Sequence, residues 1–93
     1  MQIRAVMWDA WNEEHIARHG VDPEEVEEVL VGLFAPPFIQ RARQGTYRAL
    51  GQTAAGRYLA VFFALRTPGY VYPITARDMD AKERRAYQRR RNR

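Results

Sequence analysis

The sequence has no cysteine among its 93 residues. A chain without cysteine has no disulfide framework and no thiolate ligands for zinc. It also has no apolar run approaching the ~20 residues of a membrane-spanning helix. No stretch at its start has the pattern of a secretory signal peptide. These absences predict a cytoplasmic protein that has no membrane-spanning segment.

Lysine is nearly absent as well, because fourteen of the fifteen basic residues are arginine. The charges are separated along the chain. Residues 1–30 carry two basic and eight acidic residues, whereas residues 31–93 carry thirteen basic and three acidic ones. A GC-rich genome could explain the preference for arginine but not this separation. Arginine binds phosphate through paired hydrogen bonds and stacks on bases, so the second part of the chain favours a nucleic acid partner.

The length indicates a single domain over residues 1–93. Three aspartates, at positions 9, 22 and 80, have the pattern of helix N-caps, and the last two are followed three residues later by a glutamate. Helices are therefore expected over residues 10–19, over residues 23–33, and from residue 81 into a basic tail, residues 89–93, that frays.

Alternating apolar residues predict strands over residues 2–7, 46–51, 57–66 and 70–77, with residues 38–41 as a further strand or an irregular edge. The run 57–66 is apolar on both alternating sets of positions, which is typical of a central strand covered on both faces. Pro73 cannot donate a ladder hydrogen bond, so the last strand should lie at an edge or be bulged. The order β-α-α-β-β-β-α predicts an α+β fold with N-terminal helices, a small antiparallel sheet and a C-terminal helix.

Four arginines border the predicted sheet, namely Arg48, Arg57, Arg66 and Arg77. Guanidinium groups around a dry sheet indicate an anion site. A phosphodiester under attack gains charge on its non-bridging oxygens, and fixed cations stabilise that charge. Because the 2′-hydroxyl of RNA is a built-in nucleophile, such a site could cleave RNA with no metal and no cofactor. The alternative is that each arginine is a surface residue or pairs with the acidic helices.

Two histidines, His15 and His19, share one stripe of the first predicted helix. Their spacing is that of a helical metal pair, but no glutamate lies between them and no third ligand is evident. Histidine titrates near neutral pH, so either imidazole could carry a proton if the helix faces the arginines. We select His19, Arg57 and Arg77 as candidate catalytic residues, and Arg48, Arg66 and His15 as candidate RNA-binding residues, with no metal ligand.

Short motifs in a fixed order are similar to those of the BrnT toxins. The matching segments are Trp8-Asp9, Asn12, Arg18-His19-Gly20-Val21, Glu24 to Leu30, Tyr47 to Gly51, Gly56 to Val61, Arg66, Ile74 to Arg77 and Glu83 to Tyr87. They span about residues 8–87. Among them, His19, Arg57, Arg66 and Arg77 match family motif positions, and Arg48 matches less closely.

The resemblance implies a RelE-like fold and a metal-free ribonuclease that inhibits translation. It also implies a cognate antitoxin of the BrnA kind, which holds the toxin in check. The toxin–antitoxin complex would repress its own operon through the antitoxin's DNA-binding domain. A homodimer or a toxin–antitoxin heterotetramer would be the expected assembly.

Two further interpretations of the residues stay open. In one, the chain binds a nucleic acid or a partner without doing chemistry, and arginine supplies the affinity. In the other, the acidic helix over residues 23–33 and the basic sheet serve only protein interaction, including self-association.

Overall fold

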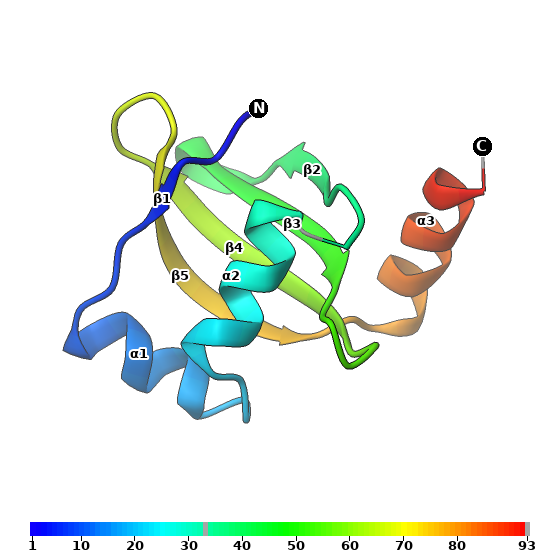
Figure 1. Ribbon diagram of the computed structural model, residues 1–93, viewed down its shortest axis with the longest axis horizontal. Coiled ribbons are helices and arrows are strands. Elements are labelled where there is room, and N and C mark those ends of the chain that lie inside the picture. Colours follow the sequence, from blue (N-terminus) through cyan, green and yellow to red (C-terminus); the bar gives the residue numbers. More distant parts are fainter. Residues whose placement is uncertain (33, 93) are drawn as a thin grey trace.

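The computed structural model describes residues 1–32 and 34–92, which form a five-stranded sheet and three α-helices. The elements are β1 (Ala5–Val6), α1 (Ala10–Ala17), α2 (Pro23–Val31), β2 (Phe38–Arg41), a 3₁₀ turn (Arg43–Gly45), β3 (Thr46–Gln52), β4 (Tyr58–Leu65), β5 (Tyr70–Asp78) and α3 (Ala81–Arg91). Two helices precede most of the sheet and one follows it (Figure 1). The predicted α+β class is confirmed.

The strand order in the sheet is β1-β5-β4-β3-β2, which confirms that β4 is central. Neighbouring strands are antiparallel except for β1, which runs parallel to β5. Residues 38–41 form a regular strand, so the chain has one strand more than the predicted order. The turn before β3 makes this pairing possible, because Gln44 and Gly45 both have positive φ angles, of 55° and 75°.

All three helices begin where the aspartates predict. The side chains of Asp9, Asp22 and Asp80 each accept a hydrogen bond from the backbone N–H three residues later, at 3.0, 3.0 and 2.8 Å. In each case the side chain of that third residue bonds back to the cap. These reciprocal bonds satisfy backbone donors that a helix start leaves without partners.

The helix ends differ from the predictions. Helix α2 ends at Val31, before a left-handed Gly32 with φ 70°, and Leu33 lies outside the described residues. Helix α3 continues to Arg91, into the tail that is expected to fray; the fraying itself stays a prediction, and Arg93 lies outside the described residues. The side chain of Arg91 donates to Gln52 Oε1 at 2.7 Å and fixes the end of α3 against β3.

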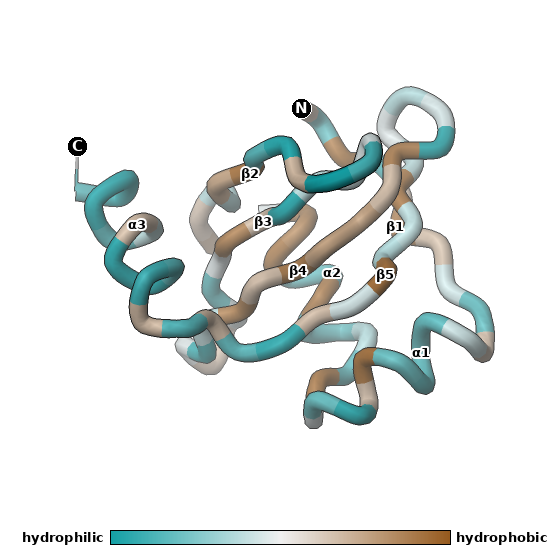
Figure 2. Tube along the Cα trace, turned by 180° about the vertical axis from the view of Figure 1, so that it is seen from behind, coloured by the Kyte–Doolittle hydropathy of each residue, from teal (hydrophilic) through white to brown (hydrophobic). Residues whose placement is uncertain are grey.

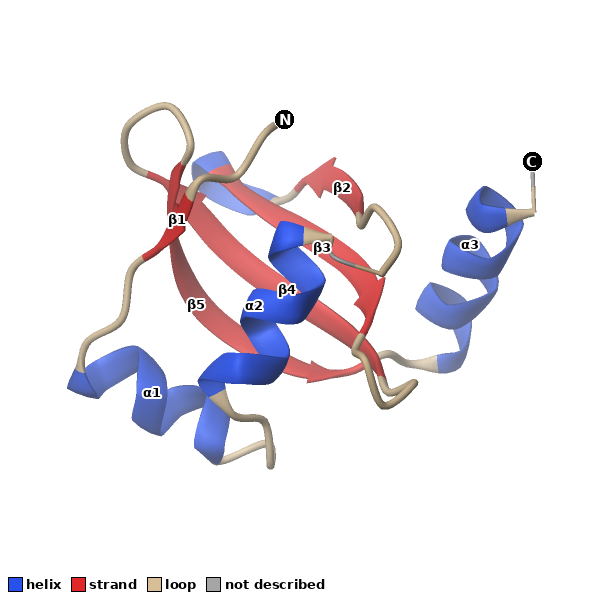
Figure 3. Ribbon diagram, viewed as in Figure 1, coloured by secondary structure: helices blue, strands red, loops and turns tan. Residues whose placement is uncertain are grey.

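The helices divide unequally between the two faces of the sheet. Helices α1 and α2 cover one face of the sheet (Figure 1). Helix α3 lies against the opposite face, at one end of it (Figure 3). The main core is formed by Ile16, Val21, Val26, Val29, Leu30, Ala49, Leu59, Val61, Phe63, Val71 and Ala76. A smaller cluster joins Tyr87 of α3 to Leu50 and Ala60. Gly51 allows close approach of α2, because a Cβ there would lie 2.7 Å from Val29 Cγ1.

Strand β5 is bulged at its proline, as predicted. Phe63 pairs with Pro73 and Phe62 pairs with Thr75, so Ile74 is an extra residue opposite β4. Side chains alternate between the two faces of a strand, and one extra residue reverses the faces of those that follow. The bulge therefore places Arg77, which pairs with Ala60, on the face opposite α1 and α2.

Candidate functional site

The sheet face opposite α1 and α2 is open over β3, β4 and β5. Figure 2 is turned by 180° from Figure 1 and shows this face toward the viewer, with α3 to one side of it. Arg48 pairs with Phe62, and Phe62 pairs with Thr75, so these three side chains share the face. Arg77 joins them on β5. The face thus presents the ring of Phe62 with one arginine on each side, Arg48 on β3 and Arg77 on β5.

Both arginines bind one carboxylate, that of Glu83 on α3. Arg77 Nη1 donates to Oε1 at 2.7 Å and Nη2 donates to Oε2 at 3.0 Å, which is a bidentate pair. Arg48 Nη1 donates to Oε2 at 3.2 Å. Glu83 is only 5 % exposed. The carboxylate therefore holds two guanidinium groups side by side at the edge of the open face.

Arg77 and Glu83 each stabilise the charged form of the other. Burial by itself raises the pKa of Glu83, but the hydrogen bonds from Arg77 and from the backbone N–H of Asp80 outweigh it and leave the pKa lowered. The hydrogen bond to Glu83 raises the pKa of Arg77 further. Glu83 is consequently ionised at neutral pH, and the cluster of two arginines and one glutamate keeps a net positive charge.

Aromatic rings lie under two of the guanidinium groups on this face. The guanidinium carbon of Arg77 lies 5.3 Å from the centroid of the Phe62 ring, and that of Arg66 lies 5.0 Å from the Tyr72 ring. Both are within the range of a cation–π contact. Arg66 therefore lies over β5 with Tyr72 rather than in direct contact with Glu83.

A cavity of about 450 Å³ opens beside the cluster, lined by Gln40, Arg41, Ala42, Arg43, Arg48 and Phe62. Gln40 accepts a hydrogen bond from Arg48 Nη2. The sequence interpretation did not select Arg41 and Arg43. Their signal was the excess of arginine after residue 30, but only the hairpin between β2 and β3 brings them beside Arg48. Three arginines and a phenylalanine ring make this cavity suitable for a phosphate with an attached base.

Arg57 lies on the other side of the sheet, at the connection between α1 and α2. Its Nε donates to Asp78 Oδ1 at 2.7 Å, and its Nη1 donates to Gly20 O at 2.8 Å and to Glu25 Oε1 at 3.1 Å. The hydrogen bond to Asp78 is the main cause that raises the pKa of Arg57 and lowers that of Asp78. The structure therefore does not bring Arg57 together with Arg77.

The two histidines lie on α1, and their contacts are with neighbours at the same end of the molecule. Trp11 stacks on His15 with 4.7 Å between ring centroids, and the His15 and His19 rings are 6.5 Å apart. The main-chain carbonyl of His19 accepts a hydrogen bond from Arg57 Nη2 at 3.5 Å. Among residues 1–32 and 34–92, no group of three or more His, Cys, Asp or Glu could hold a metal ion.

The motif Trp8-Asp9, Asn12 has a structural explanation. Asn12 is fully buried, and its Nδ2 donates to Pro73 O at 2.9 Å and to Met7 O at 3.0 Å. The hydroxyl of Tyr72 donates to Asp9 Oδ2 at 2.9 Å. Hydrogen bonds from Asn12 and Tyr72 lower the pKa of Asp9 against the effect of desolvation. The motif thus anchors the start of α1 to the bulged part of β5.

Together, the fold and this face define a small α+β protein in which Arg48, Arg77 and the buried Glu83 meet beside an open sheet face. Residues 8–83 match the family described as "Ribonuclease toxin, BrnT, of type II toxin-antitoxin system", and the chain belongs to this family. The resemblance seen in the motifs is confirmed. The family's description implies an RNA substrate and an antitoxin partner.

The fold is similar to a solved structure, the crystal structure of the Brucella abortus ribonuclease toxin, BrnT. The two share 20 % sequence identity with a TM-score of 0.64, over 82 % of this chain and 96 % of that one. The comparison with curated proteins found no match. In the part of the chain that the structure describes, no helix has the length and apolar character needed to cross a membrane.

Proposed function

We propose that this protein is an endoribonuclease toxin that inhibits translation by cleaving RNA, without a metal ion, on the open face of its sheet. The observation that carries the proposal is the convergence of Arg48 and Arg77 on the buried carboxylate of Glu83. The family to which the chain belongs is one of ribonuclease toxins. The arrangement supplies two fixed cations and one ionised carboxylate at one place, which is what transfer of a phosphoryl group to a 2′-hydroxyl needs.

Arg48 and Arg77 would bind the scissile phosphate and stabilise the charge that develops on its non-bridging oxygens. Each has a guanidinium group that is held by Glu83 before RNA arrives, so little order is lost on binding. The ring of Phe62 and the side chains of Arg41 and Arg43 would hold the adjoining nucleotide in the 450 Å³ cavity. Arg66, over Tyr72, would bind a neighbouring phosphate.

Glu83 would accept the proton of the attacking 2′-hydroxyl as the bond from the 2′-oxygen to phosphorus forms. The bond from phosphorus to the 5′-oxygen breaks in the same step, and the departing 5′-oxygen takes a proton from solvent. With its arginines in place, its pKa is lowered, which makes it a weak base. When the phosphate draws the guanidinium groups away from Glu83, the carboxylate loses the hydrogen bond from Arg77 that lowers its pKa. It keeps the hydrogen bond from the Asp80 N–H, and it keeps the burial that raises its pKa. RNA binding would thus raise its proton affinity at the moment when a base is required.

His19 and Arg57 receive a different role in this proposal from the one that the sequence suggested. Arg57 is engaged by Asp78, Glu25 and two main-chain carbonyls at the α1–α2 connection, and His19 meets Arg57 there. We assign both to holding this connection on the sheet rather than to the reaction. His15 lies beside Trp11 on the same helix, where it could contact RNA that extends past β5.

The reaction is tested with the purified chain, free of any antitoxin, and a single-stranded RNA. Cleavage should leave a 2′,3′-cyclic phosphate, and it should persist in EDTA. The same oligonucleotide with one 2′-deoxy sugar at the cut site should stay intact at that position. Absence of cleavage, or its loss in EDTA, would contradict the proposal. Induced expression in bacteria should arrest growth if the RNA cut is needed for translation.

A second function is supported by the same cluster. Because Glu83 already neutralises part of the charge of both arginines, the chain could bind RNA or a partner without cutting. Such binding would weaken steeply with salt, and no product would form. In either case we propose that the chain acts in the cytoplasm and has an antitoxin as its partner. Its assembly would be a homodimer of this chain or a heterotetramer of toxin and antitoxin.

A further inference from the structure

The outer edge of β2 has no partner strand among the described residues, because β2 is the last strand in the sheet order. The N–H of Ala42 donates to Thr46 O at 2.9 Å, next to the ladder between β2 and β3. In an antiparallel pair, residues bond to the partner strand alternately. The backbone groups of Ile39 and Arg41 therefore point away from β3, toward solvent. This edge can receive another strand.

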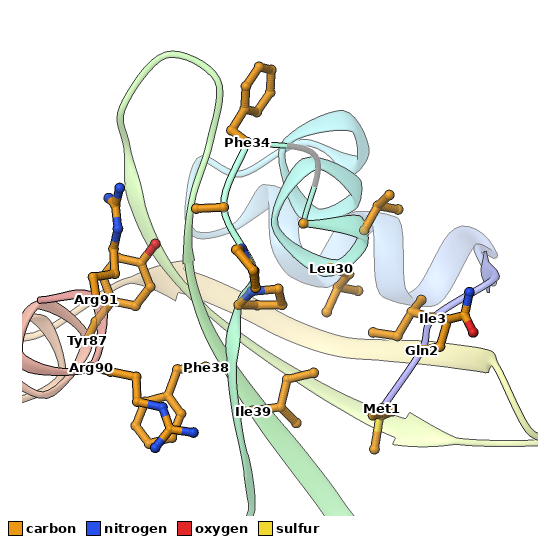
Figure 4. A pocket seen from close by; sticks show the side chains of 15 residues that line it. Met1, Gln2, Ile3, Leu30, Phe34, Phe38, Ile39, Tyr87, Arg90 and Arg91 are labelled. Atoms are coloured by element: carbon orange, nitrogen blue, oxygen red, sulfur yellow. The ribbon is translucent and has the colours of Figure 1, made fainter. Parts of the chain in front are cut away.

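A cavity of about 1020 Å³ lies at the start of this strand, where Phe38 and Ile39 line it, and one of its walls is apolar. Leu30 and Ile3 lie on one side of β2, with Phe34 above them (Figure 4). Val31 and Phe34 are 57 % and 61 % exposed, as is Met1 at 61 %. Exposed apolar side chains gathered around one groove mark a surface that another protein covers.

The opposite wall belongs to α3 and is positively charged. Arg90 lies with its guanidinium carbon 4.9 Å from the Phe38 ring centroid, and Arg91 lies 5.8 Å from that of Tyr87. Tyr87 is 1 % exposed, and its hydroxyl has no hydrogen-bond partner among the described residues. A buried hydroxyl without a partner is costly, and a carboxylate beside two arginines is the acceptor that this wall would favour.

We propose that the β2 edge is the docking site for an extended, acidic segment of a partner protein, with apolar side chains alternating with carboxylates. The segment would add a strand to β2, place its apolar side chains against Leu30, Val31 and Phe34, and place its carboxylates near Tyr87, Arg90 and Arg91. Backbone pairing gives affinity in this mode and the alternating side chains give specificity.

A second copy of this chain does not fit the same edge. Pairing β2 with β2 would set Arg41, Arg43 and Arg90 of one copy against those of the other, and like charges across an interface are unfavourable. An acidic partner would instead place negative charges against these arginines, which is favourable.

The docking site also bears on RNA, and this step rests on the proposed function. Arg41 belongs both to β2 and to the lining of the 450 Å³ cavity beside Arg48. A strand laid along β2 would reach this cavity and compete with RNA for it. The bound segment would therefore inhibit the toxin by occupying the entrance to the candidate site.

The test uses short synthetic peptides and the whole chain. The probe is a fluorescein-labelled peptide in which valine and glutamate alternate; a matched peptide carries lysine in place of glutamate, and a third carries N-methyl groups on every second backbone amide. The acidic peptide should bind with a Kd below ~1 mM, and the other two at least ~10-fold more weakly. The acidic peptide should also weaken binding of a single-stranded RNA. Equal binding of the N-methylated peptide, or no binding of the acidic one, would overturn the proposal.

Charge-reversed variants locate the site. Arg90→Glu with Arg91→Glu should weaken binding of the acidic peptide at least ~10-fold, equivalent to ~1.4 kcal/mol. Arg84→Glu with Arg85→Glu makes the same change on the same helix outside the cavity and should have a much smaller effect. Equal losses would mean attraction to net charge alone. Phe34→Ala, at an exposed position, keeps the test valid if a charge variant fails to fold, and it should also weaken binding. Peptide binding needs no RNA, so a chain that does not cleave RNA can still pass or fail this test.

Discussion

The carboxylate of Glu83 on α3 accepts hydrogen bonds from both terminal nitrogens of Arg77 on β5, at 2.7 and 3.0 Å. Glu83 itself is only 5 % exposed. This pair connects the C-terminal helix to the strand that borders the open face. Arg48 adds a third hydrogen bond from β3, so one carboxylate joins three elements. The helix is therefore held at the candidate site by the same charges that would bind the substrate.

Arg77→Ala should slow RNA cleavage at least ~10-fold, about 1.4 kcal/mol of barrier, because it removes one of two cations from the phosphate. Initial rates on a labelled oligonucleotide measure this. Arg85→Ala removes the same charge from an exposed position on α3 and should leave the rate nearly unchanged. If both variants cut equally well, Arg77 is not at the phosphate.

Glu83→Gln should change how stability depends on pH. The folded-state pKa of Glu83 is lowered, so the folded protein favours the ionised form more than the unfolded chain does. Its contribution is complete above the ordinary pKa of ~4.3 and is lost as the pH falls through the lower folded value. At neutral pH the variant should be less stable by roughly 1.5–3 kcal/mol, since charged hydrogen bonds are weakened.

The measurement is the urea midpoint of both proteins at a series of pH values. The gap between them should narrow as the solution is made more acidic below the ordinary glutamate value. Comparing the two proteins removes the effects of Asp9 and Asp78, whose pKa values are also lowered and which both proteins retain. A gap that stays constant down to strong acid would contradict the role of ionised Glu83 in stability.

Arg57→Ala should lower the free energy of unfolding by roughly 2–3 kcal/mol, because charged hydrogen bonds to Asp78 and Glu25 are lost. Cleavage per folded molecule should change little. Arg57→Lys keeps the charge, but a lysine cannot span the same acceptors, so it should recover only part of the stability. A variant that is fully stable yet inactive would return Arg57 to the catalytic residues.

Asn12→Ala should destabilise the fold by roughly 2–4 kcal/mol, because it leaves the buried carbonyl of Pro73 and the partly buried carbonyl of Met7 without their donor. Thermal or urea unfolding measures the loss. Glu13→Ala, at the next position and exposed, is the control and should cost far less. A small effect of Asn12→Ala would mean that water replaces the amide.

Local signals in the sequence predicted the elements well. The caps at Asp9, Asp22 and Asp80 depend on hydrogen bonds to residues three positions away, so the pattern contains both partners. The central position of β4 followed from its apolar residues on both faces, and the bulge in β5 followed from the missing donor of Pro73. Each of these features requires information from only a few neighbouring residues.

The grouping of the arginines required the complete fold. Arg57 begins one predicted strand and Arg77 ends another, yet Arg57 turns toward α1 and α2 while Arg77 reaches Glu83 on the open side. The reason is the single extra residue at Ile74. Without it, Arg77 would pair one position along β4 and face the helices. A pattern with a period of two residues shows that consecutive side chains of a strand lie on opposite faces of the sheet. Which of the two faces a given side chain occupies depends on how its strand pairs with a strand that is distant in the sequence.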